Sequence, residues 1–191
     1  MRHRIGFALV LVSLCGLSEA KAADHQAAFE TGQVNCATPA PPLLVHNVTA
    51  IDFRGGSPAV SENVSLVLAD GRIARILPQD HPLVQAPGEV IDGTGLTVIP
   101  GLHDMHVHLW DRTELAANLM HGVTTVRNMS GMPFHLRLGE QVEAGEVCGS
   151  HLVTSGPILN SKGADSQIYH QIVETGEDAR AAVRQQYAAG F

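Results

Sequence analysis

The chain has 191 residues, a formal net charge of −7 and 45% hydrophobic residues, a composition typical of a globular protein and not of a disordered or fibrous one. An acidic chain without a visible basic patch is not expected to bind nucleic acid. Its three cysteines are too few for a disulfide framework. Cys36 and Cys148 could pair in an exported protein, and the residues leave that pairing open.

The first 22 residues have the features of an export signal in the usual order. A basic start at Arg2–Arg4 is followed by the apolar stretch Ile5–Leu17 and by Ala20-Lys21-Ala22, a small-x-small cleavage site. The apolar stretch is shorter than a membrane span requires. We therefore expect cleavage after Ala22 and a periplasmic or secreted protein without stable membrane insertion, an uncleaved anchor being the alternative.

Residues 23–42 are polar and rich in alanine and proline, which predicts a flexible lead-in. The segment 43–100 has the signals of short strands and no helical periodicity. Asp70-Gly71 lies between two apolar runs and predicts a hairpin, because both turn positions favour positive φ. This segment is predicted to be a small β unit, with strands expected at 43–53, 64–68, 73–77, 90–91 and 96–99.

After Gly101, strands alternate with helices. Thr175 precedes an acidic first turn and is expected to cap the last helix, and Gly190 follows its end. The order β-α-β-α-β-α predicts a parallel sheet or barrel. Strands are expected at 103–109, 123–128 and 152–155, helices at 113–120, 133–144 and 176–189, and a long loop from 156 to about 168.

The segment Pro100–Leu109 carries two histidines, His106 and His108. Residues two apart on a strand point to the same face, so Asp104 is expected to line one side of the strand with both histidines. Two imidazoles can hold one divalent cation, zinc being favoured by nitrogen ligands, and Asp104 could orient one of them. The chain has 11 histidines, so the spacing alone leaves surface or hydrogen-bonded histidines as the alternative.

Other polar residues are less well placed for a metal. The histidines at 121, 135 and 151 fall before strands or on a helix, where a structural or surface role is expected. Asn128 ends the predicted second strand and is a candidate for contact with substrate. Trp110 and the loop 160–170 are candidate pocket walls, since long loops at that end of a barrel carry specificity.

The stretch Val90–Leu109 resembles the passage from the β-sandwich into the first barrel strand of the metal-dependent amidohydrolase superfamily. The resemblance continues at His121–Asn128, similar to the second strand, and covers about residues 43–191. It is closest to the imidazolonepropionase-like and prolidase-like branch. The family usually has an aliphatic residue in place of His103 and often an acidic residue in place of Asn128.

The resemblance implies an α/β fold, an incomplete (β/α)8 TIM-type barrel whose first three βα units lie at 101–191, preceded by a β-sandwich segment at 43–100. It implies zinc or another divalent metal, one ion or two, with His106 and His108 as ligands from the first strand. It also implies hydrolysis of a carbon–nitrogen bond in an amide, dipeptide or cyclic amide through a metal-activated water.

The remaining ligands and the catalytic acid–base would come from later strands, so no catalytic residue is identifiable in this chain. We therefore expect a truncated, inactive N-terminal portion of a hydrolase, and the resemblance leaves open a homo-oligomer of the full-length protein. The alternative is a short, non-catalytic binding or assembly module derived from the same fold.

Overall fold

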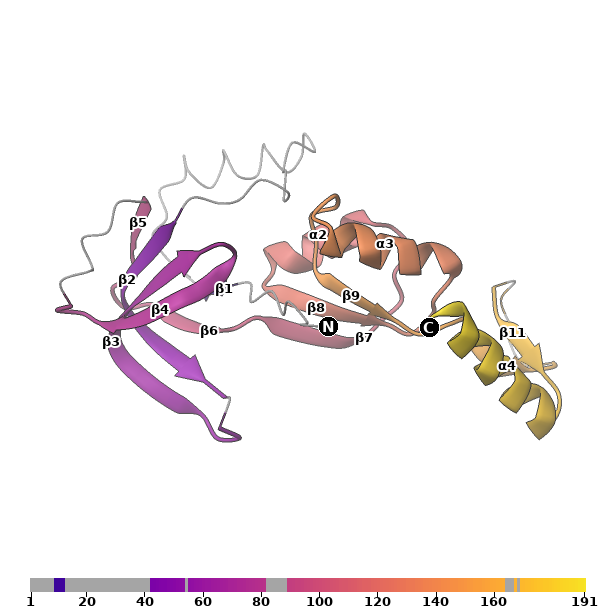
Figure 1. Cartoon of the computed structure of the whole chain (residues 1–191). Helices are drawn as coiled ribbons and strands as arrows, with labels where there is room; N and C mark the ends of the chain where they lie inside the picture. Colours follow the sequence, from indigo (N-terminus) through magenta and orange to yellow (C-terminus); the bar gives the residue numbers. More distant parts are fainter. Residues whose placement is uncertain (1–8, 13–41, 54, 82–88, 164–166, 168) are drawn as a thin grey trace. The chain divides into compact units, whose positions relative to one another are not determined.

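The computed structural model describes residues 9–12, 42–53, 55–81, 89–163, 167 and 169–191. The chain divides into two compact units between Gly101 and Leu102, and Figure 1 shows the strand-rich first unit and the mixed second unit. Each unit is described by itself. No helix among the described residues is long and apolar enough to cross a membrane.

The first unit contains one six-stranded sheet with the order β1-β6-β2-β3-β4, and β5 pairs with β2. Asp70 and Gly71 have φ angles of 53° and 68°, so the hairpin predicted between β3 and β4 is confirmed. A second sheet layer, as a β-sandwich would require, is not among the described strands. The strands are β1 (Leu9–Val12), β2 (Leu43–Asp52), β3 (Ala59–Ala69), β4 (Arg72–Pro78), β5 (Glu89–Asp92) and β6 (Thr97–Pro100).

The core of the first unit depends on an irregularity in β2. Val45 and Val48 are three residues apart and would face opposite sides of a regular strand, yet both are buried together with Leu66 and Val98. The register shifts between the two valines, and Asn47 between them has a φ of 59°. The bulge therefore turns both side chains into one core.

Strand β1 lies within the predicted export signal and pairs antiparallel with β6. The rest of the predicted signal and the lead-in, except Pro42, fall outside the described residues. Cleavage after Ala22 therefore stays a prediction.

The second unit contains a parallel three-stranded sheet in the order β7-β8-β9. The helices between these strands, α2 and α3, pack against the sheet and lie over one side of it (Figure 1). This confirms the predicted alternation of strands and helices around a parallel sheet; closure into a barrel is not seen among the described strands. The elements are β7 (Leu102–Val107), α2 (Thr113–Met120), β8 (Val123–Asn128), α3 (Pro133–Glu143) and β9 (His151–Thr154).

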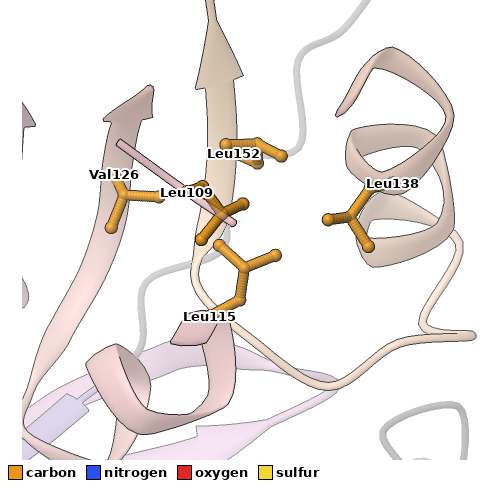
Figure 2. Packing of buried hydrophobic residues seen from close by; sticks show 5 residues of the cluster. All are labelled: Leu109, Leu115, Val126, Leu138 and Leu152. Carbon is orange, nitrogen blue, oxygen red and sulfur yellow. The ribbon is translucent and has the colours of Figure 1, made fainter. Parts of the chain in front are cut away.

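The core of the second unit joins the helices to the sheet. Leu115 on α2 and Leu138 on α3 approach Leu109, Val126 and Leu152 (Figure 2), and all five are buried. Burying each such side chain contributes about 1.5–3 kcal/mol. This packing holds the end of β7 against both helices.

The predicted loop 156–168 is partly ordered into a strand. β10 (Leu159–Ser161) pairs in parallel with β11 (Gln171–Val173), and α4 (Gly176–Ala189) follows. The prediction of a loop was wrong there, because a three-residue strand is stabilised by pairing with the segment that follows the loop. The caps of α4 are confirmed: the Thr175 hydroxyl accepts the Asp178 N–H at 3.1 Å, and Gly190 has a φ of 101°.

Candidate metal centre

His106 and His108 lie at the carboxyl end of β7, side by side. Their ring centroids are 5.4 Å apart and their planes differ by 23°. Both side chains are exposed, while the alternating residues Val107 and Leu109 pack in the core beneath the helices. The alternation therefore brings the two imidazoles to the face of the sheet away from α2 and α3.

The separation of the two rings matches that of two imidazoles bound to one zinc ion. Two imidazoles bound tetrahedrally through bonds of about 2.0–2.1 Å have ring centres about 5 Å apart, close to the observed 5.4 Å. Within the described part of the chain, no group of three or more His, Cys, Asp or Glu residues could hold a metal ion. The pair by itself thus supplies two nitrogen ligands, fewer than the three protein ligands of a catalytic zinc site.

Asp104 contacts His106 through the main chain. Its Oδ1 accepts the His106 N–H at 3.1 Å. The pairing register with β8 shifts between Asp104 and Val107, so simple alternation does not extend from Asp104 to the histidines. Asp104 is placed to fix the backbone at His106, and no contact between the carboxylate and an imidazole is seen among the described residues.

Asn128 ends β8 and is completely buried. Its Oδ1 accepts the Leu109 N–H at 3.1 Å and the Ser130 N–H at 3.3 Å. Its Nδ2 donates to the Thr154 hydroxyl at 3.2 Å. The amide thus joins the ends of β7, β8 and β9, and contact between Asn128 and a substrate stays a prediction.

His135 is the buried histidine that the sequence interpretation undervalued. Its side chain has an exposed fraction of 0%, and burial lowers its pKa. Nδ1 accepts the Met132 N–H at 2.9 Å, so Nε2 carries the proton and donates to the Leu109 carbonyl at 2.9 Å. Its place in the first turn of α3, after Pro133, was the available signal, since side chains there reach back to the preceding main chain.

Trp110 follows directly after Leu109 and is half-exposed. Its ring packs edge-on against Tyr169 at a centroid distance of 5.1 Å, so the two predicted wall elements do meet. Trp110 also lines a groove of about 610 Å³ with Arg112, Phe134 and Arg137. Neither metal-candidate histidine lines this groove, so a role for Trp110 in the substrate pocket stays a prediction.

The other histidines of this unit have local partners. The His121 ring bonds the Ala117 carbonyl at 2.8 Å, and His151 pairs with Glu143. Both lie at the amino ends of β8 and β9, away from the ends that carry Asn128 and Thr154. Cys148, near His151, is disulfide-bonded, and the two other cysteines of the chain lie outside the described residues.

Comparisons with known proteins support the resemblance inferred from the sequence. The chain is 38% identical over 68 residues to a dihydroorotase of Solibacter usitatus, a match that spans 36% of this chain and 14% of the relative. It is 35% identical over 71 residues to a deacetylase of Agrobacterium fabrum, spanning 36% and 16%. No protein-family model matches the chain.

A solved structure assigned as a prolidase from Bifidobacterium longum superposes with a TM-score of 0.61 and 28% identity. The chain resembles amidohydrolases. The superposition covers 80% of this chain and 40% of that one, so the amidohydrolase likeness extends over most of the chain while the chain spans less than half of the structural neighbour. The mixed α/β fold is that of these proteins.

Proposed function

We propose that this chain is part of a metal-dependent hydrolase of carbon–nitrogen bonds, with His106 and His108 as ligands of a divalent metal, zinc being the best match. The single observation that carries the proposal is the near-parallel imidazole pair at the carboxyl end of β7. Carboxyl ends of parallel strands are where α/β barrels carry their active sites. The fold proposed for the full-length protein is such a barrel, with the first unit contributing to a β-sandwich.

The chain's own residues would bind and orient the metal. His106 and His108 are nitrogen donors on one sheet face, and Asp104 fixes the main chain at His106. A divalent metal held there would supply a water of lowered pKa and polarise the scissile group. Trp110, packed on Tyr169, is proposed as a wall of the substrate pocket.

Three substrate classes are proposed: amides, dipeptides and cyclic amides. They follow from the names of the relatives, a deacetylase, a prolidase and a dihydroorotase. The full-length protein should hydrolyse a member of at least one class in a zinc-dependent manner. His106→Ala and His108→Ala should each abolish turnover, while His121→Ala should leave it unchanged. Full activity in the double variant His106→Ala/His108→Ala would refute the proposal.

We further propose that the 191-residue chain alone has no turnover, because its described residues supply only two ligands. The purified chain should bind Zn²⁺ weakly through the pair without hydrolysing any of the three substrate classes. Hydrolysis that scales with added zinc would overturn this part. Export is proposed as well, and N-terminal sequencing of the mature protein should find the chain starting after Ala22.

A further inference from the structure

The main chain around His108 is held by hydrogen bonds on both sides. On its amino side, the Val107 carbonyl accepts the Met129 N–H at 2.8 Å. On its carboxyl side, the Leu109 N–H donates to Asn128 Oδ1 at 3.1 Å. The two peptide groups that flank His108 are therefore both fixed by consecutive residues at the end of β8, which restricts the φ and ψ angles of His108.

A third bond extends this restraint toward Trp110. The Leu109 carbonyl accepts the proton of His135 Nε2 at 2.9 Å, and His135 is in turn oriented by the Met132 N–H. Asn128 and His135 are both completely buried. Burying a polar group costs free energy unless the group is hydrogen-bonded. Here Asn128 and His135 bond the N–H and the carbonyl of Leu109, in the two peptide groups on either side of that residue.

We propose that Asn128 and His135 are positioning residues for the His106–His108 metal pair, acting through the Leu109 main chain and not by touching metal or substrate. The inference rests on the proposed function, since a restrained main chain at His108 matters only if the His108 imidazole binds a metal. It also gives Asn128 a reason to be an amide: Oδ1 accepts two main-chain N–H groups, while Nδ2 donates to Thr154.

A purely structural role is the competing explanation, and Ser150 provides the matched control. Ser150 is also completely buried in the same unit. Its hydroxyl lies 3.1 Å from the Leu115 carbonyl and 2.5 Å from the Val123 carbonyl, at the amino ends of the strands. Removing it should lower stability without touching the backbone of the metal pair.

The test is a Zn²⁺ titration of the 191-residue chain, followed by the NMR resonances of the histidine side chains, with a thermal melt of every variant. In the wild type, the His106 and His108 resonances should shift together with one Kd. Asn128→Ala and His135→Ala should each weaken binding by about tenfold, the lower end of what partners beyond the ligands contribute, and His108 should no longer follow His106. Asn128→Asp keeps the Oδ1 acceptor, and its second oxygen can accept a proton from the Thr154 hydroxyl, so this variant should weaken binding less than Asn128→Ala does.

The outcomes separate the two proposals. If His106→Ala and His108→Ala leave Zn²⁺ binding unchanged, the proposed metal pair itself fails. If the pair binds but Asn128→Ala and His135→Ala match the wild type, or Ser150→Ala weakens binding as much as they do, the positioning role fails. Should both alanine variants unfold, Thr154→Val removes the acceptor of Asn128 Nδ2 together with the bond from the Thr154 hydroxyl to the Ser155 carbonyl. This variant should also weaken Zn²⁺ binding, and no change in it would overturn the inference.

Discussion

Both ends of the β7–β8–β9 sheet bury polar side chains, but the hydrogen bonds of these side chains go to different parts of the main chain. At the amino ends, Ser150 bonds carbonyls of Leu115 and Val123 and so ties α2 to the sheet. At the carboxyl ends, Asn128 and His135 bond the main chain next to His108. The first arrangement closes the fold, whereas the second restrains the segment that carries the candidate ligands.

Because of this difference, the stability of the unit and the geometry of the candidate metal site depend on different buried polar groups. A buried polar group left without its partner costs about 1–3 kcal/mol at either end. Only at the carboxyl ends is that cost coupled to the orientation of an imidazole. Substitutions at the two ends should therefore have similar effects on unfolding and different effects on Zn²⁺ binding.

The largest effect is expected from Gly131→Ala, at the carboxyl ends. A Cβ at residue 131 would lie 1.6 Å from the Ser155 carbonyl oxygen, a main-chain atom that cannot move aside without breaking the bond between Gly131 N–H and the Gly156 carbonyl. We expect a loss of about 3 kcal/mol in the free energy of unfolding, measured by urea denaturation, because the backbone must shift and this is the upper end of the usual cost of overpacking.

Alanine substitutions at two further glycines test whether the cost follows the closeness of the contact. Gly149→Ala, at the amino ends, places its Cβ 2.5 Å from Leu115 Cβ. This substitution should cost less than Gly131→Ala because the approach is less close, although Leu115 Cβ is fixed to the main chain and the backbone must still shift. Gly139→Ala on α3 has its nearest neighbour, the Leu152 carbonyl, at 3.4 Å and should be neutral or stabilise by up to about 1 kcal/mol through helix propensity. Equal effects of the three substitutions would refute the clash argument.

Ser150→Ala should have the next largest effect. Loss of its hydroxyl leaves the half-buried Val123 carbonyl without this donor, and we expect a loss of about 1–3 kcal/mol in the free energy of unfolding. Because the Leu109 main chain is untouched, Kd for Zn²⁺ should remain at the wild-type value. A parallel fall in stability and in Zn²⁺ affinity would mean that the two ends are not independent.

Local patterns predicted much of this unit, and contacts between distant residues account for what they missed. The hairpin at Asp70-Gly71 and the cap at Thr175 depend on residues next to each other, so the sequence was sufficient for both. The pair His106 and His108 follows from alternation along one strand. The positioning of His108 instead depends on Leu109 meeting Asn128 and His135, contacts over 19 and 26 residues, which no periodicity reveals.

The same limit explains two other differences. Strand β10 forms through pairing with β11 across a loop, so its sequence alone reads as irregular. The register shift in β7 next to Asp104 breaks the alternation that predicted Asp104, His106 and His108 on one face. A bulge is set by the partner strand, and for that reason the position of Asp104 could not be derived from β7 alone.

The free energy of unfolding should depend on pH through His135, at the carboxyl ends of the sheet. This effect should be smaller than that of Ser150→Ala. Burial lowers the pKa of His135 below its ordinary value of 6.5, so the unfolded chain takes up this proton at a higher pH than the folded chain. The free energy of unfolding should therefore fall as the pH drops below about 6.5, until the pH reaches the pKa of the folded state. Thermal melts of the wild type between pH 7.5 and about pH 5 should reveal this slope.

His135→Gln should flatten that slope, since glutamine does not titrate. Loss of stability at lower pH should persist in the variant, because a hydrogen bond from the Thr175 hydroxyl lowers the pKa of Asp178 below 3.8 and its contribution is lost only in that range. An unchanged slope near pH 6 in His135→Gln would assign the effect to another histidine.

The smallest effect is expected from His151→Gln, at the amino ends. His151 pairs with Glu143, but the two side chains are 49% and 54% exposed, and solvent-exposed ion pairs contribute about 0–1 kcal/mol. Urea denaturation at neutral pH should show a change within that range. Zn²⁺ binding should be unchanged, because His151 begins β9 at the end opposite Asn128 and Thr154. If His151→Gln lowered Zn²⁺ affinity as much as Asn128→Ala, an imidazole at the amino ends would be a ligand. The buried polar groups at the carboxyl ends could then no longer be said to act on Zn²⁺ binding while those at the amino ends act on stability alone.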